Sequence, residues 1–318
     1  MAEDGKIPAD AAIGATVADA IEWAAKRFRA ANIHFGHGTD NPDDEAAALV
    51  FHVAGVTYPA NAGDYSKRLD EKQRRQLMAL VEARISSRDP AAYLIGEAWF
   101  AGLRFFVDNR VLVPRSPIAE LIGDRFEPWI DSGSVMRILD LCTGSGCIAI
   151  ACAAEFPRAT VDASDVSADA LEVASMNVAR HGLEDRVRLV HSDLFENLEG
   201  RRYDLIVSNP PYVSKAEMEQ LPAEYTREPR LGLEAGTDGL QLARRILENA
   251  REHLTDHGLL VVEVGASQPA LEAAYPRVPF TWVEFEYGGE GVFLMSAGEL
   301  DACSAEFAVA EEKQQNGR

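Results

Sequence analysis

The sequence has few cysteines and no long apolar run among its 318 residues. Three of its four cysteines, Cys142, Cys147 and Cys152, recur every five residues, which matches no zinc-ligand pattern, and Cys303 stands apart. We therefore expect reduced, apolar cysteines and no metal site. No stretch of about 20 uninterrupted apolar residues is present to span a membrane. The N-terminal stretch MAEDGKIPAD lacks the positive charge of a signal peptide, so we expect a soluble, cytoplasmic protein without a membrane partner.

The chain is also short of basic residues. Asp and Glu total 51 against 31 Lys and Arg, which gives a formal net charge of −20. Residues 101–318 carry 36 of the acidic and 20 of the basic residues. Such a field repels a phosphate backbone and speeds the encounter with a basic partner. The charge therefore argues against a DNA or RNA substrate and favours a cationic protein.

One segment, Ser214 to Asp238, is itself acidic. Its carboxylates are Glu217, Glu219, Glu224, Glu228, Glu234 and Asp238, against the basic residues Lys215, Arg227 and Arg230. We predict that this segment faces the substrate. For any single carboxylate in it, an ordinary solvated loop is an equally good explanation.

The first part of the chain has helical patterns and no strand signal. Thr16 is a suitable cap for a helix with one apolar face. Asn41 followed by Pro42 and an acidic first turn is a strong helix start. A further helix is predicted from about Asp70, where apolar residues keep a 3.6-residue period.

Extended patterns follow, and we predict a β-hairpin with strands over 99–107 and 110–114 and a turn at residues 108–109. Strand and helix patterns then alternate, which predicts an α/β domain with a parallel sheet. The tail from Glu299 is polar, and we expect it to fray. The predicted parts are residues 1–92 (helical domain), 93–117 (hairpin linker), 118–298 (α/β domain) and 299–318 (polar tail).

A predicted buried strand over 135–141 leads into a glycine-rich turn and then a helix. The turn comprises Cys142, Thr143, Gly144, Ser145 and Gly146. Its glycines permit a tight turn and the close approach of a ligand, and the helix start offers free N–H groups. Asp165, which closes the next predicted strand, stands where an acid for ribose hydroxyls belongs. These residues fit a nicotinamide dinucleotide as well as S-adenosylmethionine.

The most informative stretch is Asn209-Pro210-Pro211-Tyr212, directly after an apolar run over 203–208. In an open parallel sheet, ligands bind beyond the carboxyl ends of the strands. Two prolines fix φ and remove two backbone donors, which leaves rigid acceptors that suit a planar, conjugated NH2 group. The stretch resembles the signature of S-adenosylmethionine-dependent methyltransferases that act on such groups. As turn chemistry alone it would only end a strand, but nicotinamide chemistry has no use for it.

Taken together, residues 15 to 298, roughly, resemble the HemK/PrmC-like protein glutamine methyltransferases. That family has a helical substrate-recognition domain, a linking hairpin and a class I, Rossmann-like methyltransferase domain with a seven-stranded sheet. Members that act on class-one release factors usually carry Pro-Arg-Pro-Asp-Thr-Glu after the hairpin. This chain has Pro114-Arg115-Ser116-Pro117-Ile118-Ala119-Glu120 there, which looks like the branch that methylates the third protein of the large ribosomal subunit. Ribosomal proteins are basic, in agreement with the charge argument.

The resemblance implies S-adenosylmethionine as methyl donor, S-adenosylhomocysteine as product, and N(5)-methylglutamine in that ribosomal protein, free or within a ribosome precursor. It implies that Asn209, Pro210 and Tyr212 are catalytic and, with Pro211, bind the glutamine amide. The residues implied for the cofactor are Cys142, Thr143, Gly144, Ser145, Gly146, Asp165, Asp193, Leu194 and Asn209. For Asp193, which would accept from the adenine amino group, a turn or helix-cap role is an equally good explanation.

Three alternatives stay open. The same chemistry on release factors is one. Amino methylation of nucleic acid is another, although it would need a basic groove that the sequence does not show. The third treats the N-terminal helices as a module for ribosome assembly, with catalysis incidental.

Overall fold

The computed structural model describes residues 13–316, and their side chains as far as Phe307. The chain divides into two compact units. The first runs to Ala98 and also takes in Pro222–Arg227, and the second comprises Trp99–Leu221 and the chain from Glu228 onward. A short segment of the later sequence is therefore part of the first unit.

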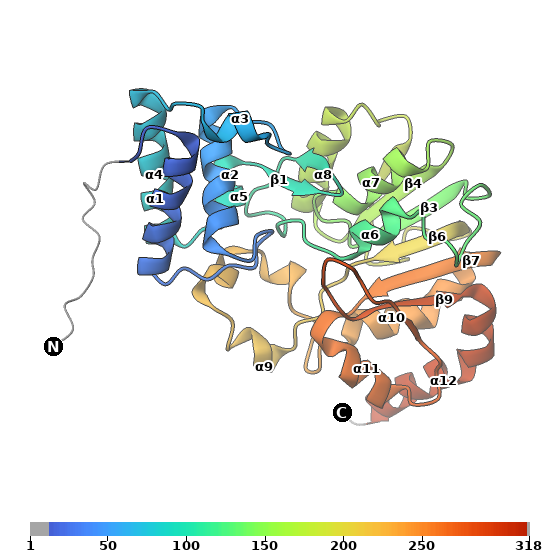
Figure 1. Cartoon of the computed structure of the whole chain (residues 1–318). Helices are drawn as coiled ribbons and strands as arrows, with labels where there is room; N and C mark the ends of the chain where they lie inside the picture. The colour runs from blue at the N-terminus through green and yellow to red at the C-terminus, as the bar shows by residue number, and fades with distance from the viewer. Residues whose placement is uncertain (1–12, 317–318) are drawn as a thin grey trace. The chain divides into compact units, whose positions relative to one another are not determined.

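The first unit is helical (Figure 1). Its helices are α1 (Val17–Ala30), α2 (Pro42–Ala54), α3 (Ala62–Tyr65), α4 (Glu71–Ser87), α5 (Ala91–Ile95) and the short 3-10 helix η1 (Ala223–Arg227). The predicted starts at Thr16 and Asn41 are confirmed. Thr16 Oγ1 accepts a hydrogen bond from Asp19 N at 3.2 Å, and Asn41 Oδ1 accepts one from Asp44 N at 2.9 Å. Both caps satisfy N–H groups that a helix start leaves without a partner.

An ion pair between Arg84 of α4 and Glu45 of α2 lies inside this unit, with side chains that are 0% and 1% exposed. Arg84 Nη2 also donates to His34 O at 3.0 Å, and Thr39 Oγ1 donates to the second carboxylate oxygen of Glu45 at 3.0 Å. Buried charges are tolerated only with such partners. One polar network therefore joins two helices and the loop between α1 and α2.

The second unit is built on a seven-stranded sheet with the order β5-β4-β3-β6-β7-β9-β8 (Figure 1). Neighbours among β3 to β7 are parallel, and β9 is antiparallel to both β7 and β8. The strands are β3 (Arg137–Leu141), β4 (Thr160–Asp165), β5 (Val187–His191), β6 (Tyr203–Ser208), β7 (Leu254–Glu263), β8 (Thr281–Trp282) and β9 (Val292–Ser296). The predicted seven-stranded α/β fold after a helical region is confirmed.

Helices cover this sheet: α7 and α8 contact β3, β4 and β5, and α12 contacts β7 and β9. The helices are α6 (Ile118–Gly123), α7 (Cys147–Glu155), α8 (Ala168–Arg180), α9 (Lys215–Met218), α10 (Gln241–Asn249), α11 (Gln268–Ala274) and α12 (Ala297–Asn316). Short 3-10 helices are η2 (Arg230–Gly232), η3 (Ala250–His253) and η4 (Gly265–Ser267). Tyr203 and Ile206 of β6 and Leu260 and Val262 of β7 share one hydrophobic core with α10 and α12.

The hairpin differs from the prediction. Its strands are β1 (Ala98–Phe100) and β2 (Leu103–Phe105), and the turn lies at residues 101–102, where φ is 47° and 73°. Two positive φ values in succession are what a two-residue hairpin turn requires. The chain does turn after Asp108, where Val111 N donates to Asp108 O at 3.2 Å, but this turn does not join the two hairpin strands. The Asp108 carboxylate accepts hydrogen bonds there from Arg110 N at 3.0 Å and Arg110 Nη2 at 2.7 Å.

The tail from Glu299 also differs from the prediction of a fraying segment. It forms helix α12, in which Leu300, Cys303 and Phe307 are buried in the core shared with β6, β7 and α10. These residues recur at three- and four-residue spacing and so lie on one helix face. The polar and charged residues at the end of the sequence, EEKQQNGR, make this apolar spacing hard to recognise from composition. As far as it is described, the tail closes the core.

The buried ion pair of the first unit gives a stability prediction. Glu45→Ala leaves Arg84 buried without its counter-ion, and we expect the free energy of unfolding to fall by about 3–5 kcal/mol. Replacing both partners with apolar residues, Glu45→Leu with Arg84→Met, is expected to cost far less. Urea unfolding followed by circular dichroism measures both.

The matched control is Glu71→Ala, which breaks the exposed ion pair with Arg75 on α4. Exposed pairs at this spacing contribute about 0.3–0.5 kcal/mol. A Glu45→Ala protein as stable as this control would contradict the role given to the buried pair.

Candidate functional site

Strands β3 and β6 are neighbours in the sheet, although β4 and β5 separate them in the sequence. Leu141 pairs with Ser208, and Ser208 Oγ donates to Leu141 O at 2.9 Å. The glycine-rich turn and the Asn209–Tyr212 segment therefore leave adjacent strand ends. The chain changes direction across the sheet at this place, which is where open α/β sheets bind ligands.

The turn after β3 has a backbone that suits close ligand approach. Positive φ values occur at Cys142 (60°), Gly144 (54°) and Gly146 (80°). A Cβ added at Gly144 would meet no atom within 4 Å, so the space before it is open among the described residues. Gly146 caps α7 without a side-chain hydrogen bond, which leaves the N–H groups of the helix start that precede Ala149 for a polar ligand.

Asp140, which the sequence prediction missed, braces this turn from within. It is fully buried, and its Oδ2 accepts hydrogen bonds from Thr143 Oγ1 at 2.5 Å and Ala149 N at 3.0 Å. Burial raises the pKa of Asp140 to about 7, against the two hydrogen bonds, which lower it. The hydroxyl of Thr143, predicted to face the cofactor, is therefore engaged by Asp140. An acid within the apolar end of a strand, just before the turn, was the available signal.

Asn177 is a second brace that the sequence prediction missed. Its Nδ2 donates to Ser145 O and to Phe106 O, both at 2.9 Å, and its Oδ1 accepts from Phe106 N at 2.7 Å. A buried amide on α8 thus ties the glycine-rich turn to the chain that follows the hairpin. No local pattern in the sequence indicates these distant partners.

Asp165, at the end of β4, lies beside the same turn. Its Oδ2 accepts from Gly144 N and its Oδ1 accepts from Ser167 N, each at 2.9 Å. Burial raises its pKa, and the backbone hydrogen bonds oppose that rise. Each carboxylate oxygen has a second lone pair for a further donor.

Asp193 and Leu194 follow β5. Asp193 Oδ1 accepts from Arg245 Nη1 of α10 at 2.9 Å, so this carboxylate already has a cationic partner. Leu194 has a φ of 49°, and its side chain is buried in the core shared by β6, β7, α10 and α12. Cys142 packs against the same core. Burial raises the pKa of the Cys142 thiol, which keeps it neutral. The pair Cys142 and Leu194 therefore forms an apolar margin beside the turn.

The loop after β6 is held on both sides. Pro210 and Pro211 are buried, and Tyr212 O accepts from Ser267 Oγ at 2.8 Å. The Tyr212 hydroxyl donates to the buried carboxylate of Glu263 at 3.1 Å. Within residues 13–316, no hydrogen bond holds the half-buried side chain of Asn209. Its amide group is therefore the polar side chain of this loop that a ligand can engage.

The acidic segment departs from the prediction at two residues. Glu224 is 2% exposed and belongs to the first unit, where it accepts from Arg88 Nη1 at 2.9 Å. Glu228 is 4% exposed in the second unit and accepts from both terminal nitrogens of Arg115 at 2.7 Å. These carboxylates are internal ion-pair partners and do not face a substrate. Exposed carboxylates of the segment include Glu217, which lies on α9.

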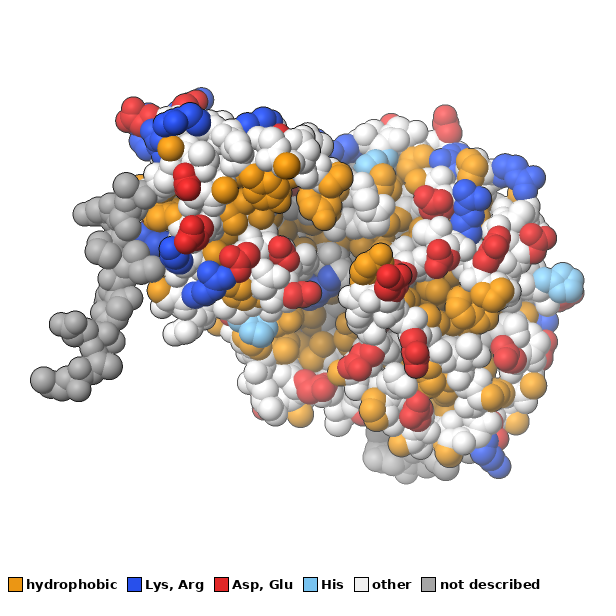
Figure 2. Space-filling model, viewed as in Figure 1, with side chains coloured by type: hydrophobic (Ala, Val, Ile, Leu, Met, Phe, Trp, Pro, Cys, Tyr) orange, Lys and Arg blue, Asp and Glu red, His pale blue; other side chains and the backbone are white. Residues whose placement is uncertain are grey.

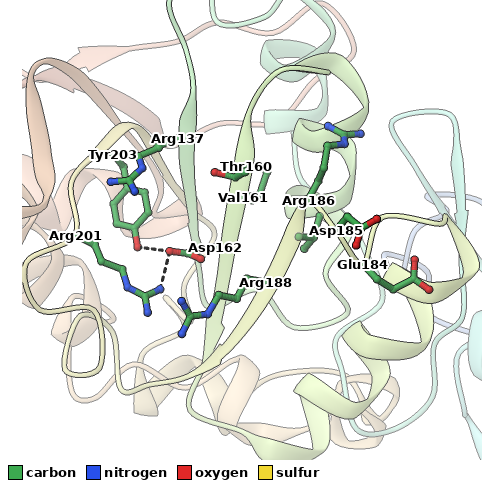
Figure 3. Close-up of a pocket in the computed structure, with 11 residues that line it drawn as sticks. Arg137, Thr160, Val161, Asp162, Glu184, Asp185, Arg186, Arg188, Arg201 and Tyr203 are labelled. Carbon is green, nitrogen blue, oxygen red and sulfur yellow. Dashed lines mark hydrogen bonds and ion pairs between the residues drawn. The ribbon is translucent and has the colours of Figure 1, made fainter.

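A cavity of about 300 Å³ lies at the other edge of the sheet, where β3, β4, β5 and β6 begin (Figure 3). Asp162 is held there by Arg201 Nη1 at 2.8 Å and by the Tyr203 hydroxyl at 2.7 Å, as the dashed lines in Figure 3 mark. The cavity is remote from the strand ends that carry the turn and the Asn209 loop. We assign it no part in the site.

Between residues 13 and 316, no group of three or more His, Cys, Asp and Glu side chains is arranged to hold a metal ion. The helices of the same part are too short or too polar to cross a membrane.

Two protein families match different parts of the chain. The PrmC N-terminal domain family matches residues 19–96, and the Methyltransferase small domain family matches residues 129–225. A ribosomal protein uL3 glutamine methyltransferase of Francisella tularensis is 48% identical over 286 residues, which are 90% of this chain and 91% of that protein. The enzyme of the same name from Neisseria meningitidis serogroup B is 49% identical and covered to 94%.

These similarities extend over both units, and the predicted family is confirmed. The chain is a methyltransferase, as the family match and the names of its relatives agree. It belongs to the family of the ribosomal protein uL3 glutamine methyltransferases.

Proposed function

We propose that this enzyme transfers a methyl group from S-adenosylmethionine to the side-chain amide nitrogen of a glutamine in ribosomal protein uL3. The observation that carries the proposal is identity near one half, over 90% of the chain, to relatives named for this reaction. The Asn209 loop at the switch point of the sheet supports it. We infer that the reaction takes place in the cytoplasm, on uL3 that is free or within a ribosome precursor.

The residues around the glycine-rich turn fit the cofactor. Open space before Gly144 admits it, and the start of α7 would present the N–H groups that precede Ala149 to its polar atoms. Asp165 would accept from the ribose hydroxyls with its remaining lone pairs. Cys142 and Leu194 would line the apolar side, and Asp193 has one carboxylate oxygen outside its bond to Arg245. When bound, S-adenosylmethionine supplies an electrophilic methyl group on sulfur.

The Asn209 loop would bind the amide that receives this methyl group. An amide nitrogen is a poor nucleophile because its lone pair is conjugated with the carbonyl. Acceptors at Asn209 Oδ1 and Pro210 O would take hydrogen bonds from its two N–H groups and fix the nitrogen in line. These bonds strengthen as positive charge develops on nitrogen, so they favour the transition state over the ground state. No general base is needed before methyl transfer, and the proton leaves the nitrogen afterwards.

A basic protein partner agrees with the formal charge of −20. Acidic side chains are spread over the face shown in Figure 2 and do not form one patch. Glu217 and Glu219 are exposed on and just after α9, which follows the Asn209 loop. We propose that this region meets the basic substrate and that the helical unit, residues 13–98 of the described chain, helps to recognise it.

The substrate is tested by incubating the enzyme with labelled S-adenosylmethionine and, separately, purified uL3 and a class-one release factor. We expect one methyl group on a uL3 glutamine and none on the release factor, as read by mass spectrometry. Asn209→Ala is expected to lower kcat by roughly 10²- to 10³-fold, by analogy with a lost oxyanion donor. Its affinity for the cofactor should stay near that of the wild type. Label on the release factor alone would overturn the choice of substrate.

Asp165 gives a prediction about cofactor affinity. Asp165→Ala removes a charged acceptor, and we expect S-adenosylmethionine binding to weaken by about 1–3 kcal/mol in calorimetry. Because Asp165 also holds Gly144 N, Asp165→Asn serves as the milder variant that keeps one acceptor. The control is Asp185→Asn, an exposed carboxylate at the opposite sheet edge. Equal affinity in all three variants would remove Asp165 from the cofactor site.

Salt tests the electrostatic part of the proposal. Raising ionic strength from about 0.05 to 0.5 M shortens the Debye length from about 14 to 4 Å. We expect kcat/KM for uL3 to fall through slower association, with kcat little changed. Glu217→Gln with Glu219→Gln should reproduce part of that loss at low salt.

The control pair for the salt experiment is Glu252→Gln with Asp256→Asn. It changes the net charge equally but at the start of β7, away from the carboxyl ends of the strands. If both double variants change kcat/KM equally, Glu217 and Glu219 at α9 have no special part in meeting the substrate.

A further inference from the structure

Glu263 is a buried carboxylate at the carboxyl end of β7, one strand away from the Asn209 loop in the sheet. It is 4% exposed. Its Oε1 accepts a hydrogen bond from the Tyr212 hydroxyl at 3.1 Å, and its Oε2 accepts one from Ser116 Oγ at 2.5 Å. The proposed methyl transfer to the glutamine amide does not use this carboxylate. Moving a carboxylate out of water costs free energy, so its presence at this buried position calls for a role.

Two glycines allow the ring and the carbonyl group of Tyr212 to pack closely against the neighbouring backbone. A Cβ on Gly265 would lie 2.6 Å from Cε2 of the Tyr212 ring, and a Cβ on Gly239 would lie 2.4 Å from Tyr212 O. Both positions therefore require glycine. Ser267 Oγ fixes the same carbonyl at 2.8 Å. With the backbone and one ring edge held, the bond to Glu263 determines where the other end of the ring lies.

Ser116 brings the linker into the same network. Its oxygen accepts from Ile118 N at 3.2 Å, so its single proton is available for Glu263. The preceding residue, Arg115, forms two hydrogen bonds with the buried carboxylate of Glu228. Two adjacent linker residues are thus anchored to carboxylates from two different places in the second unit.

The protonation state of Glu263 depends on these neighbours. Burial raises its pKa to about 7, while the hydroxyls of Ser116 and Tyr212 and the positive charge of Arg115 act in the opposite direction. Above that pH the carboxylate accepts both hydroxyls. Below it, one oxygen carries a proton and no longer accepts, so the hydroxyl that faces this oxygen must reverse its hydrogen bond or give it up. The charge on Arg115 is itself balanced by Glu228.

We propose that Glu263 is a positioning residue for methyl transfer, which acts through Tyr212 to hold the Asn209-Pro210 acceptors in place. This inference rests on the proposed function of the Asn209 loop. Its ionised form would keep the aromatic ring fixed beside the amide, and its protonated form would change the hydrogen bond to the Tyr212 hydroxyl or to the Ser116 hydroxyl. In this role Glu263 touches neither substrate nor cofactor.

The experiment compares the wild type with Glu263→Gln, Tyr212→Phe and the double variant, between about pH 6 and pH 8.5. In the wild type, kcat should fall as the pH drops through about 7. Glu263→Gln should lower kcat by about ten- to a hundredfold, the loss expected for one hydrogen bond to a charged group, and should remove that pH dependence. Cofactor affinity should not change. The double variant should be no slower than Tyr212→Phe, because both changes break the same contact.

Two controls separate this role from a loss of folding or of function. Glu299→Gln removes a carboxylate that accepts from Ser296 N at 2.7 Å, at the end of β9 opposite Leu259 of β7, and should keep the wild-type pH profile. Asp140 has a similar pKa, so infrared difference spectra of the protein alone identify the Glu263 carboxyl band as the one that Glu263→Gln abolishes. Tyr212→Phe should shift that band.

The outcomes are distinct. A wild-type protein inactive on uL3, with a Glu263 band that shifts in Tyr212→Phe, would overturn the proposed function. An active wild type with an unaltered Glu263→Gln pH profile, or additive losses in the double variant, would overturn the positioning role.

Discussion

The parallel pairing of β3 with β6 is the constraint on which the site depends. Leu141 lies opposite Ser208, so the glycine-rich turn and the Asn209 loop start from adjacent strand ends. The hydrogen bond from Ser208 Oγ to Leu141 O joins these two ends directly. The two loops therefore leave the sheet from neighbouring strands, which lie about 4.8 Å apart.

Buried carboxylates then fix the loops that leave this sheet edge. Asp140 holds the turn to α7, Glu228 holds Arg115 of the linker, and Glu263 holds Tyr212. Each accepts hydrogen bonds from groups that are distant in sequence or belong to another element. Part of the acidic composition is therefore internal architecture, and the formal charge overstates the carboxylates that a substrate can meet.

The sequence predicted the central strands, the two helix starts at Thr16 and Asn41 and the family, because each depends on local periodicity, capping or a contiguous motif. It did not predict Asn177 or Glu263 as partners of the site loops, since their hydrogen bonds join residues 32 to 147 positions apart. The prediction that the acidic segment faces the substrate failed at Glu224 and Glu228 for the same reason, because their partners Arg88 and Arg115 are distant in the sequence. Nothing local distinguishes Glu224, which is buried against Arg88, from exposed Glu219.

Helix α12 has a practical consequence for where the catalytic unit ends. Composition suggests a boundary at residue 298, but Leu300, Cys303 and Phe307 complete the core beside β7 and α10. A recombinant protein shortened to that boundary would present an uncovered apolar surface to solvent, which favours self-association. The minimal unit for expression therefore extends at least through Phe307, and a C-terminal tag belongs beyond it.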